Sequence, residues 1–303
     1  MKAAICTKYG PPEAVKIEEW PKPSPRDNEI LVRVRATTVA SGDCQVRGAN
    51  VPAIFKPMLW LVFGVGKPRR PIFGTELSGQ IEAVGKNVTT FKAGDSVFAM
   101  TGMKMGAHAE YVALPENWAV ALMPSNFTYE QAAAISFGGT TALHFLRKGN
   151  LQKGQKVLIY GASGSVGTSA VQLAKHYFGA ETTGVCSGAN VELVKSLGAD
   201  RVIDYTAEDF RGKSERYDVI FDAVGKITKS SCKGVIASGG RYVSISRGLA
   251  IERVEDLRLL GELAQSGKYS PVIDRTYPLE QIVDAYAYAD TGRKKGNVVI
   301  TLQ

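Results

Sequence analysis

Residues 156–178 read KVLIYGASGSVGTSAVQLAKHYF, and this stretch decides the fold. Its first part, Lys156–Tyr160, is a short apolar run of the kind that forms a buried strand. Its last part, Ser165–Phe178, is amphipathic with the period of a helix. A strand, a glycine-rich turn and a helix in this order predict the first βαβ unit of a parallel sheet.

The turn itself, YGASGSVG at Tyr160–Gly167, follows the GxGxxG pattern with Ala162 at the first glycine. Gly164 lets the backbone come close to a pyrophosphate, and Gly167 lets helix and strand pack tightly. The helix N-terminus supplies backbone N–H groups and a positive dipole end for the phosphates. The alternative is a tight turn between strand and helix that binds no ligand. We expect a dinucleotide to contact Ala162, Ser163, Gly164, Ser165, Val166 and Gly167.

The end of the second strand indicates which dinucleotide is bound. A carboxylate about 20 residues after the turn would bind a ribose 2′-hydroxyl, and it would repel a 2′-phosphate. None stands at this strand end, because the nearest, Glu192, falls inside the next helix. Ser187 and Asn190 offer hydrogen-bond donors there, with Lys175 and Tyr205 as further neighbours. This pattern favours NADPH over NADH, although Ser187 has an alternative role as a helix N-cap.

Downstream of the turn, strands and helices alternate, which argues for a parallel sheet with helices on both faces. A late helix is expected at Leu279–Asp290 and a final strand at Asn297–Thr301. The other elements are strands at Thr182–Val185, Arg201–Asp204, Asp218–Asp222 and Arg241–Ile245, a helix at Asn190–Leu197, and a helix between the last two strands.

Upstream of the turn, the chain is β-rich. Alternating runs at Glu29–Arg35, Leu77–Val84 and Asp95–Ala99 are separated by Gly and Pro. We expect no helix of useful length before about residue 128. There Thr128 is followed three residues later by Gln131, a capping-box pattern that begins the helical region.

Composition excludes several classes of protein. The chain of 303 residues is 45% hydrophobic and 22% charged, as a folded globular protein is. Four cysteines without a CxxC motif and three histidines favour neither a disulfide framework nor a zinc cluster, and they fit a reducing, cytoplasmic location.

The net charge of +8 divides evenly between residues 123–270 and the rest, so nucleic acid is not expected as a partner. The longest apolar stretch, Met58–Val65, is too short to span a membrane, and no membrane partner is expected.

Four segments together resemble the medium-chain dehydrogenase/reductase superfamily, and within it the zinc-independent quinone-oxidoreductase-like branch. The resemblance implies an α/β fold of two domains. Residues 1–122 and 271–303 would form a GroES-like, partly open β-barrel, and residues 123–270 an inserted Rossmann domain with a doubly wound parallel sheet. The four segments are 1–15 (MKAAICTKYGPPEAV), 74–99 (GTELSGQIEAVGKNVTTFKAGDSVFA), 160–175 (YGASGSVGTSAVQLAK) and 296–300 (GNVVI).

Zinc-dependent members of the superfamily bind their catalytic metal through three residues. The corresponding positions of this chain hold Ala40, Thr75 and Phe137, none of which is a useful zinc ligand. The four-cysteine lobe that holds structural zinc in such members has no counterpart either. The resemblance therefore implies an enzyme that binds neither zinc.

Without a metal, the oxygen that becomes negative during reduction must be stabilised by hydrogen bonds. The resemblance implies catalytic roles near the substrate cleft for Ser41, Thr75 and Thr141. It implies cofactor contacts, beside those already named, at Thr140, Val224, Gly225, Ser244, Ile245 and Asn297.

No strong general acid stands out in the sequence. Asp43 and Glu76 are expected to hold the barrel and cleft together, and His108 and His144 lack an identifiable orienting partner. Reduction of a quinone or an activated alkene fits this inventory, because solvent can finish protonation. The predicted function is NADPH-dependent hydride transfer to a quinone or an α,β-unsaturated carbonyl. Two alternatives stay open: an alcohol or aldehyde oxidoreductase, and a non-catalytic NADPH-binding relative with a structural or RNA-binding role.

Two further segments have more than one interpretation. The apolar stretch Pro52–Pro71 is either a lid over the cleft or a surface packed on the barrel or a dimer partner. The segment Ser246–Asp256 is shorter than in longer relatives, where this region often supplies a dimerisation strand. A homodimer is therefore an open alternative to a monomer.

Overall fold

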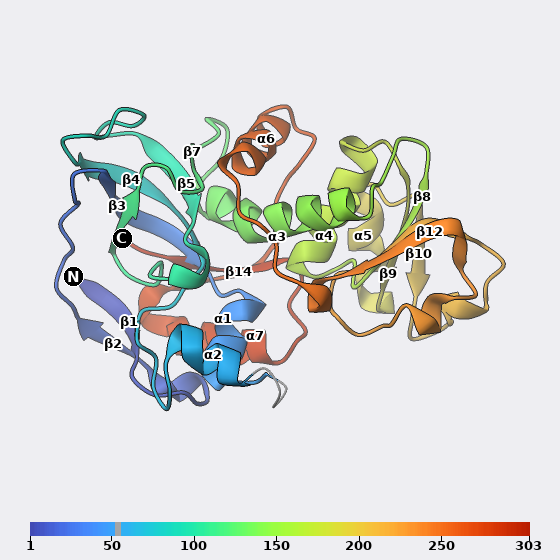
Figure 1. Cartoon of the computed structure of the whole chain (residues 1–303), viewed down its shortest axis with the longest axis horizontal. Helices are drawn as coiled ribbons and strands as arrows, with labels where there is room; N and C mark the ends of the chain where they lie inside the picture. Colours follow the sequence, from blue (N-terminus) through green and yellow to red (C-terminus); the bar gives the residue numbers. More distant parts are fainter. Residues whose placement is uncertain (52–55) are drawn as a thin grey trace. The chain divides into compact units, whose positions relative to one another are not determined.

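The computed structural model describes residues 1–51 and 56–303 (Figure 1). Two compact units make up the chain. The first combines N-terminal and C-terminal segments, and the second lies between them in the sequence. The first comprises Met1–Ser136, Arg253–Gly261 and Ile273–Gln303, and the second comprises Phe137–Glu252 and Glu262–Val272.

The first unit is built on a mixed sheet: β3 (Glu29–Thr38), β4 (Glu76–Val84), β5 (Ser96–Met100), β6 (Tyr111–Pro115), β7 (Val120–Leu122), β13 (Ile273–Pro278) and β14 (Asn297–Thr301). Its order is β13-β14-β3-β4-β5-β7, with β6 also paired to β3. β13 and β14 run parallel, and the other neighbours are antiparallel. β1 (Lys2–Cys6) and β2 (Val15–Glu19) form a separate antiparallel ribbon.

Three helices accompany this sheet: α1 (Ser41–Gly48), α2 (Lys56–Phe63) and α7 (Ile282–Asp290). The first two show that the expectation of no helix before residue 128 was wrong. α1 contains two glycines and is held mainly by tertiary contacts, since the buried Arg47 donates to the Gly10 carbonyl at 2.6 Å. α2 is apolar almost throughout, so it carries no amphipathic period.

A capping box opens the long helix α3 (Tyr129–Lys148), as the sequence predicts. The Thr128 amide donates to Gln131 Oε1 at 3.0 Å, and the Gln131 amide donates to Thr128 Oγ1 at 3.3 Å. A further helix, α6 (Val254–Gln265), was not anticipated from the sequence.

The second unit contains a parallel sheet of five strands in its described residues: β8 (Lys156–Tyr160), β9 (Glu181–Cys186), β10 (Arg201–Asp204), β11 (Tyr217–Asp222) and β12 (Ile236–Ser244). Its order, β10-β9-β8-β11-β12, is that of a doubly wound fold, and every pair is parallel. The predicted strands and their parallel pairing are confirmed.

The helices α4 (Ser165–His176) and α5 (Val191–Ser196) pack on this sheet, and α3 reaches it through Phe145, which stacks on Phe221 of β11. α4 contacts β8 and β9, and α5 contacts β9 and β10. α4 ends at His176, two residues before the predicted limit. The predicted helix between β11 and β12 was wrong, because the residues between them contain only a short 3₁₀ turn at Ser230–Cys232.

Candidate functional site

The turn after β8 depends on two glycines. Gly161 has φ +82°, and a Cβ there would lie 2.5 Å from Cγ1 of Val224. A Cβ on Gly167 would lie 2.0 Å from the Gly161 carbonyl oxygen. These contacts confirm that Gly167 permits close packing of helix and strand. The sequence reading gave no role to Gly161, although its place directly after the strand is the signal for a left-handed turn residue.

Gly164 differs from these two glycines. Its φ is −80°, and the nearest atom to an added Cβ is the Gly161 oxygen at 3.7 Å, so neither strain nor crowding requires glycine there. The first backbone hydrogen bond of α4 runs from the Thr168 amide to the Gly164 carbonyl at 2.8 Å. The amides of Val166 and Gly167 precede it, so they have no acceptor within the helix. An open glycine before a helix N-terminus fits a pyrophosphate group.

The loop after β11 lies next to this turn in the sheet order. Ligands of doubly wound folds bind at the carboxyl ends of the strands where the order reverses, which here is between β8 and β11. Val224 touches the turn through Gly161 and is 38% exposed. Gly225, at φ +72°, follows it. Both are residues for which cofactor contact was predicted.

Asp222, the last residue of β11, organises this loop. Its buried carboxylate accepts backbone hydrogen bonds from four residues at 2.8–3.3 Å. Ser244 Oγ, at the end of β12, also donates to it, at 3.2 Å. The side chain of Ser244 is therefore engaged within the protein, and Ile245 follows it half-buried. The sequence reading missed Asp222, although a carboxylate at a strand end before a glycine-containing loop is a visible signal. The four donors are the amides of Val224, Gly225, Lys226 and Ile227.

Three predicted residues form one hydrogen-bonded group. Asn190 Nδ2 donates to Ser163 Oγ at 3.2 Å and to Ser187 Oγ at 3.1 Å. Both serine hydroxyls act as acceptors in these bonds, so their own protons are available for another partner. The buried Asn190 Oδ1 has no hydrogen-bond partner among the described residues. The group joins the turn after β8 to the loop after β9 and offers two donors and one acceptor.

A carboxylate does lie near this group, at the end of the predicted strand Arg201–Asp204, although the prediction considered only the end of the preceding strand. A Cβ on Gly188 would lie 2.5 Å from Oδ2 of Asp204, the last residue of β10. Hydrogen bonds from the side chain and amide of Thr206, and one from the Gly188 amide, lower the pKa of Asp204. Asp204 is thus charged at neutral pH and already engaged by neighbouring donors.

Tyr205 follows β10 and is 53% exposed. A hollow of about 340 Å³ lies beside it. Lys175, expected in this neighbourhood, lies instead at the other end of its helix, where its Nζ pairs with Asp200 at 2.5 Å. Asp200 accepts a hydrogen bond from the Thr182 amide at the start of β9. Lys175 therefore lies at the amino ends of the strands, and the predicted site is at their carboxyl ends. The hollow is lined by Tyr160, Tyr205, Glu208, Asp209, Phe210, Arg211, Lys226 and Ile227.

Thr140 and Thr141 lie on α3, in the part that belongs to the second unit, and both are buried. Gly138, just before them, packs closely on α4, because an added Cβ would lie 2.7 Å from Ser165 Oγ. Thr140 Oγ1 makes a long contact of 3.4 Å with the Phe137 carbonyl. The structure thus brings the segment with both threonines to the N-terminus of α4.

The other predicted site residues lie in the first unit. Ser41 is exposed at the start of α1. Thr75 is buried, and its Oγ1 has no hydrogen-bond partner among the described residues. Asn297 is buried and donates from Nδ2 to the Ala134 carbonyl at 3.1 Å, which ties β14 to α3. Thr75 is therefore a buried hydroxyl whose donor is not used by another described residue.

A buried polar group surrounds Thr75. Asp43 Oδ2 accepts from the Ala40 amide at 2.8 Å, and burial raises the pKa of Asp43 to about 7. Glu76 accepts a short hydrogen bond from Thr38 Oγ1. These contacts agree with the structural role expected for Asp43 and Glu76. Burial also lowers the pKa of Lys294, whose charge interacts with both carboxylates.

The two candidate histidines have partners inside the protein. His108 Nε2 bonds the Thr38 carbonyl at 2.9 Å, and its Nδ1 lies 3.3 Å from the Tyr286 hydroxyl. Burial lowers the pKa of His108 to about 4, so the ring is neutral and cannot donate a proton as an imidazolium near pH 7. His144 Nδ1 lies 3.5 Å from the Ile251 amide.

A metal site would need a group of donor side chains. Ala40 and Thr75 occupy two of the three positions that correspond to zinc ligands, and Phe137 the third. Among residues 1–51 and 56–303, no three His, Cys, Asp or Glu side chains are grouped so that they could hold a metal. The same residues contain no helix long and apolar enough to cross a bilayer.

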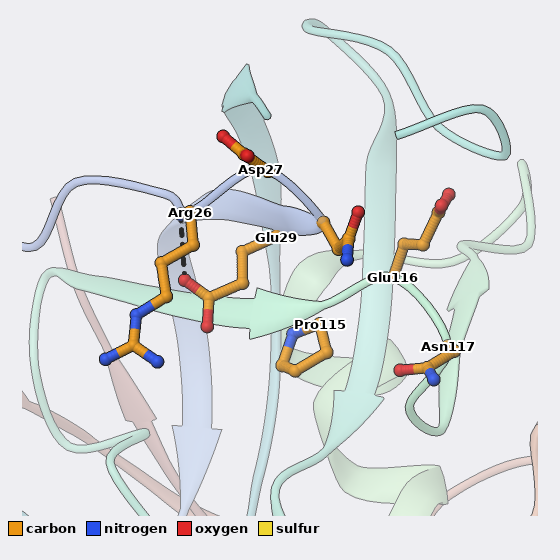
Figure 2. Close-up of a pocket in the computed structure, with 7 residues that line it drawn as sticks. Arg26, Asp27, Glu29, Pro115, Glu116 and Asn117 are labelled. Carbon is orange, nitrogen blue, oxygen red and sulfur yellow. Dashed lines mark hydrogen bonds between the residues drawn. The ribbon is translucent and has the colours of Figure 1, made fainter. Parts of the chain in front are cut away.

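A second hollow, of about 810 Å³, lies on the first unit where β3 begins and β6 ends (Figure 2). Two of its three carboxylates are engaged with turn backbone: Glu29 accepts from the Arg26 amide at 2.9 Å, as Figure 2 shows, and Glu116 accepts from the Thr89 and Thr90 amides. The third, Asp27, pairs with Lys86 at 3.1 Å. Glu29 and Glu116 therefore stabilise turns in this hollow.

Comparisons with known proteins agree with this architecture. The alcohol dehydrogenase GroES-like domain model matches residues 26–125, and the zinc-binding dehydrogenase model matches residues 197–300. The 2-methylene-furan-3-one reductase of Solanum lycopersicum is 34% identical, over 99% of this chain and 79% of its own length. The chloroplastic NADPH-dependent alkenal/one oxidoreductase of Arabidopsis thaliana is 31% identical over the same shares.

Solved structures show the same fold. The quinone oxidoreductase from Coxiella burnetii matches with a TM-score of 0.85 at 26% identity, covering 100% of this chain and 99% of its own. The predicted fold class is thereby confirmed: a GroES-like domain with a Rossmann-type parallel sheet.

Proposed function

The chain belongs to the medium-chain dehydrogenase/reductase superfamily, in its quinone-oxidoreductase-like branch, and from this premise we propose that it reduces a quinone or an α,β-unsaturated carbonyl with NADPH and without zinc. That the chain is an oxidoreductase follows from its relatives. The acceptor, the choice of NADPH and the independence from zinc are our proposals. We also propose domain limits of 1–122 with 271–303, and 123–270, and a cytoplasmic location.

One observation carries the proposal. Thr75 stands where zinc-dependent members have a metal ligand, and its buried Oγ1 has no hydrogen-bond partner among the described residues. A hydroxyl in that position can donate to a carbonyl oxygen as negative charge develops on it. It cannot replace a metal in deprotonating an alcohol, which would need a base or a Lewis acid. Thr75 therefore fits an enzyme that reduces a substrate activated by a carbonyl group.

The Ser163, Ser187 and Asn190 group supports NADPH. Two hydroxyl donors suit the oxygens of a 2′-phosphate, and the Gly164 turn with the α4 N-terminus suits the pyrophosphate. Bound NADPH supplies the hydride. The protein's part is to hold the dinucleotide through these groups and to polarise the acceptor through Thr75, with Ser41 and Thr141 as further candidates.

Protonation after hydride transfer is assigned to solvent. The buried ring of His108 is not an imidazolium near pH 7 and so lacks an acidic proton, and Asp43 is enclosed by its own contacts. Quinones and enones tolerate this arrangement because their reduced anions are readily protonated by water.

The test is a substrate panel of quinones, enones, saturated aldehydes and alcohols, followed by the absorbance of the reduced nicotinamide with NADPH and with NADH. We expect turnover of quinones or enones with NADPH, and little with saturated aldehydes or alcohols. Preferred turnover of alcohols, with zinc recovered from purified enzyme, would replace our proposal with the alcohol oxidoreductase alternative. Tight NADPH binding without any turnover would instead favour a non-catalytic role.

A further inference from the structure

Helix α2, drawn in Figure 1, and the residues after it present a concentrated apolar surface on the first unit. Five large apolar side chains are exposed there within eight residues: Met58 (56%), Trp60 (37%), Leu61 (72%), Val62 (37%) and Val65 (73%). We call these five residues the α2 surface. Apolar side chains gathered in this way mark an interaction site more often than ordinary protein surface.

Anchoring contacts fix which side of α2 points outward. Leu59 is 7% exposed, and Phe63, one helical turn later, packs against the core of the unit. The Tyr9 hydroxyl donates to the Gly64 carbonyl at 2.8 Å just after the helix. Because Leu59 and Phe63 occupy the inward side, Leu61 lies on the opposite side of the helix, and Met58, Trp60 and Val62 lie on its flanks.

Positive charge flanks this surface in the sequence. Residues 44–75 contain five Lys and Arg and no Asp or Glu. One of the five, Arg47, is buried and paired with Asp290. The other four are exposed and form no ion pair within residues 1–51 and 56–303; they are Lys56, Lys67, Arg69 and Arg70.

The combination of apolar side chains and positive charge favours one kind of binding partner for the α2 surface over the others. A second copy of the chain would bring the same patch face to face in a symmetric dimer, so four cations would meet four cations. A protein partner would have to supply both an apolar groove for the helix and acidic side chains placed to meet the four cations. An anionic lipid surface requires neither, since it offers apolar chains below and negative headgroups around them.

We propose that the α2 surface inserts into the interface of an anionic bilayer, with the four cations against the headgroups. The proposal is independent of the redox function. It concerns surface association and departs from the sequence expectation of no membrane partner, which rested on the lack of a stretch long enough to span a bilayer. Trp60 is of the residue type favoured at membrane interfaces. Each cation near an anionic surface strengthens binding by about fivefold, so the four together make a measurable contribution.

The experiment is co-sedimentation of the full-length protein with vesicles of phosphatidylcholine alone or with one-third phosphatidylserine, at low and high salt. We expect binding to the anionic vesicles only, and weaker binding as salt increases. The variant Leu61→Ser/Val65→Ser should lose at least about tenfold in partitioning, because two exposed aliphatic side chains no longer enter the lipid. The variant Arg69→Ala/Arg70→Ala should lose about 25-fold.

Matched controls carry the same kinds of substitution elsewhere. Leu249 is 67% exposed, and Lys229 and Lys233 are exposed. The variants Leu249→Ser and Lys229→Ala/Lys233→Ala should bind like the unmodified protein, and circular dichroism checks that all variants are folded. Equal binding to neutral and anionic vesicles, equal losses in the controls, or no binding at all would overturn the proposal. So would light scattering showing a dimer that Leu61→Ser/Val65→Ser converts to monomer.

Discussion

Asn190 Nδ2 donates to Ser163 Oγ across 3.2 Å, and this bond links the glycine-rich turn after β8 to the loop after β9. The two residues are 27 positions apart in the sequence, yet they form one edge of the proposed dinucleotide site. Because the same amide nitrogen also bonds Ser187, one side chain sets the positions of both hydroxyls. Asn190 is therefore the residue at which the cofactor preference can be altered with least disturbance.

Asn190→Asp should reverse that preference. A carboxylate of nearly the same size would repel a 2′-phosphate but accept from a ribose hydroxyl. We expect kcat/KM with NADPH to fall on the order of tenfold or more, with NADH little changed. Steady-state kinetics with both cofactors measures this. An equal fall with both would show that Asn190 supports the loops without facing the 2′ position.

Gly167→Ala should lower stability, whereas Gly164→Ala should lower dinucleotide affinity. At Gly167 the new methyl group would meet the Gly161 carbonyl at 2.0 Å, so we expect a loss of about 1–3 kcal/mol in the free energy of unfolding. At Gly164 the methyl has room in the protein, and only dinucleotide affinity should fall. Urea unfolding together with cofactor titration separates the two. A stable Gly167→Ala variant would contradict the packing assigned to this turn.

Asp222→Ala should loosen the loop after β11. Its carboxylate accepts four backbone amides, and their loss of a partner should cost about 3 kcal/mol in the free energy of unfolding. Asp222→Asn keeps one acceptor oxygen, so its free energy of unfolding should lie between those of Asp222→Ala and the native chain. Thermal unfolding measures both. If Asp222→Ala retains the native stability, the carboxylate does not organise the loop.

Thr75→Val should reduce turnover without changing cofactor binding. Removing one donor to a developing oxyanion typically lowers kcat by about 100-fold. Thr75→Ser, which keeps the hydroxyl, should recover most of the rate. The comparison of kcat with the Kd for NADPH distinguishes this role from a structural one. Full activity in Thr75→Val would remove Thr75 from the mechanism.

Asp43 should make stability depend on pH. Burial raises the pKa of this carboxyl in the folded state to about 7, well above its value in an unfolded chain. The folded state therefore binds more protons between about pH 4 and pH 7, so stability falls as pH rises through this window. Asp43→Asn, which can still accept from the Ala40 amide, should flatten the dependence. Urea midpoints at pH 5 and pH 8 test this, and an unchanged slope in the variant would exclude Asp43 as the source.

Much of the second unit and the start of α3 were predictable because the signals are local. The apolar run at Lys156–Tyr160, the glycines of the turn and the capping pair Thr128 and Gln131 each act over a few residues. The gathering of Ser163, Ser187 and Asn190 followed from the strand order of the fold, once the parallel sheet was inferred.

Features that depend on distant contacts were missed. α1 is short and rich in glycine, and it is held by the contacts of Arg47 with Gly10 and Asp290, which no local pattern announces. Asp204 approaches Gly188 from a different strand, so a search limited to the end of β9 could not find it. Lys175 was misplaced because its position along α4 puts it at the wrong edge of the sheet.

In the stretch Pro52–Pro71, too, local sequence could not predict which residues are buried. Phe55, one of its aromatic residues, lies outside the described residues. Leu59 is buried, whereas Leu61 and Val65 are exposed. An apolar sequence alone could not separate anchoring from outward-facing positions, because α2 lacks a polar face to give the period.

The most direct test of the account is to follow the hydride. Enzyme freed of metal by a chelator is mixed with NADPH deuterated on the transferred face of the nicotinamide C4, and with an α,β-unsaturated ketone. The product is then examined by mass spectrometry and NMR. We expect one deuterium on the β-carbon of the saturated ketone, at a rate that chelation does not change and that NADH does not match. Loss of turnover on chelation and its recovery with added zinc, or deuterium found on the carbinol carbon of an alcohol product, would contradict the account.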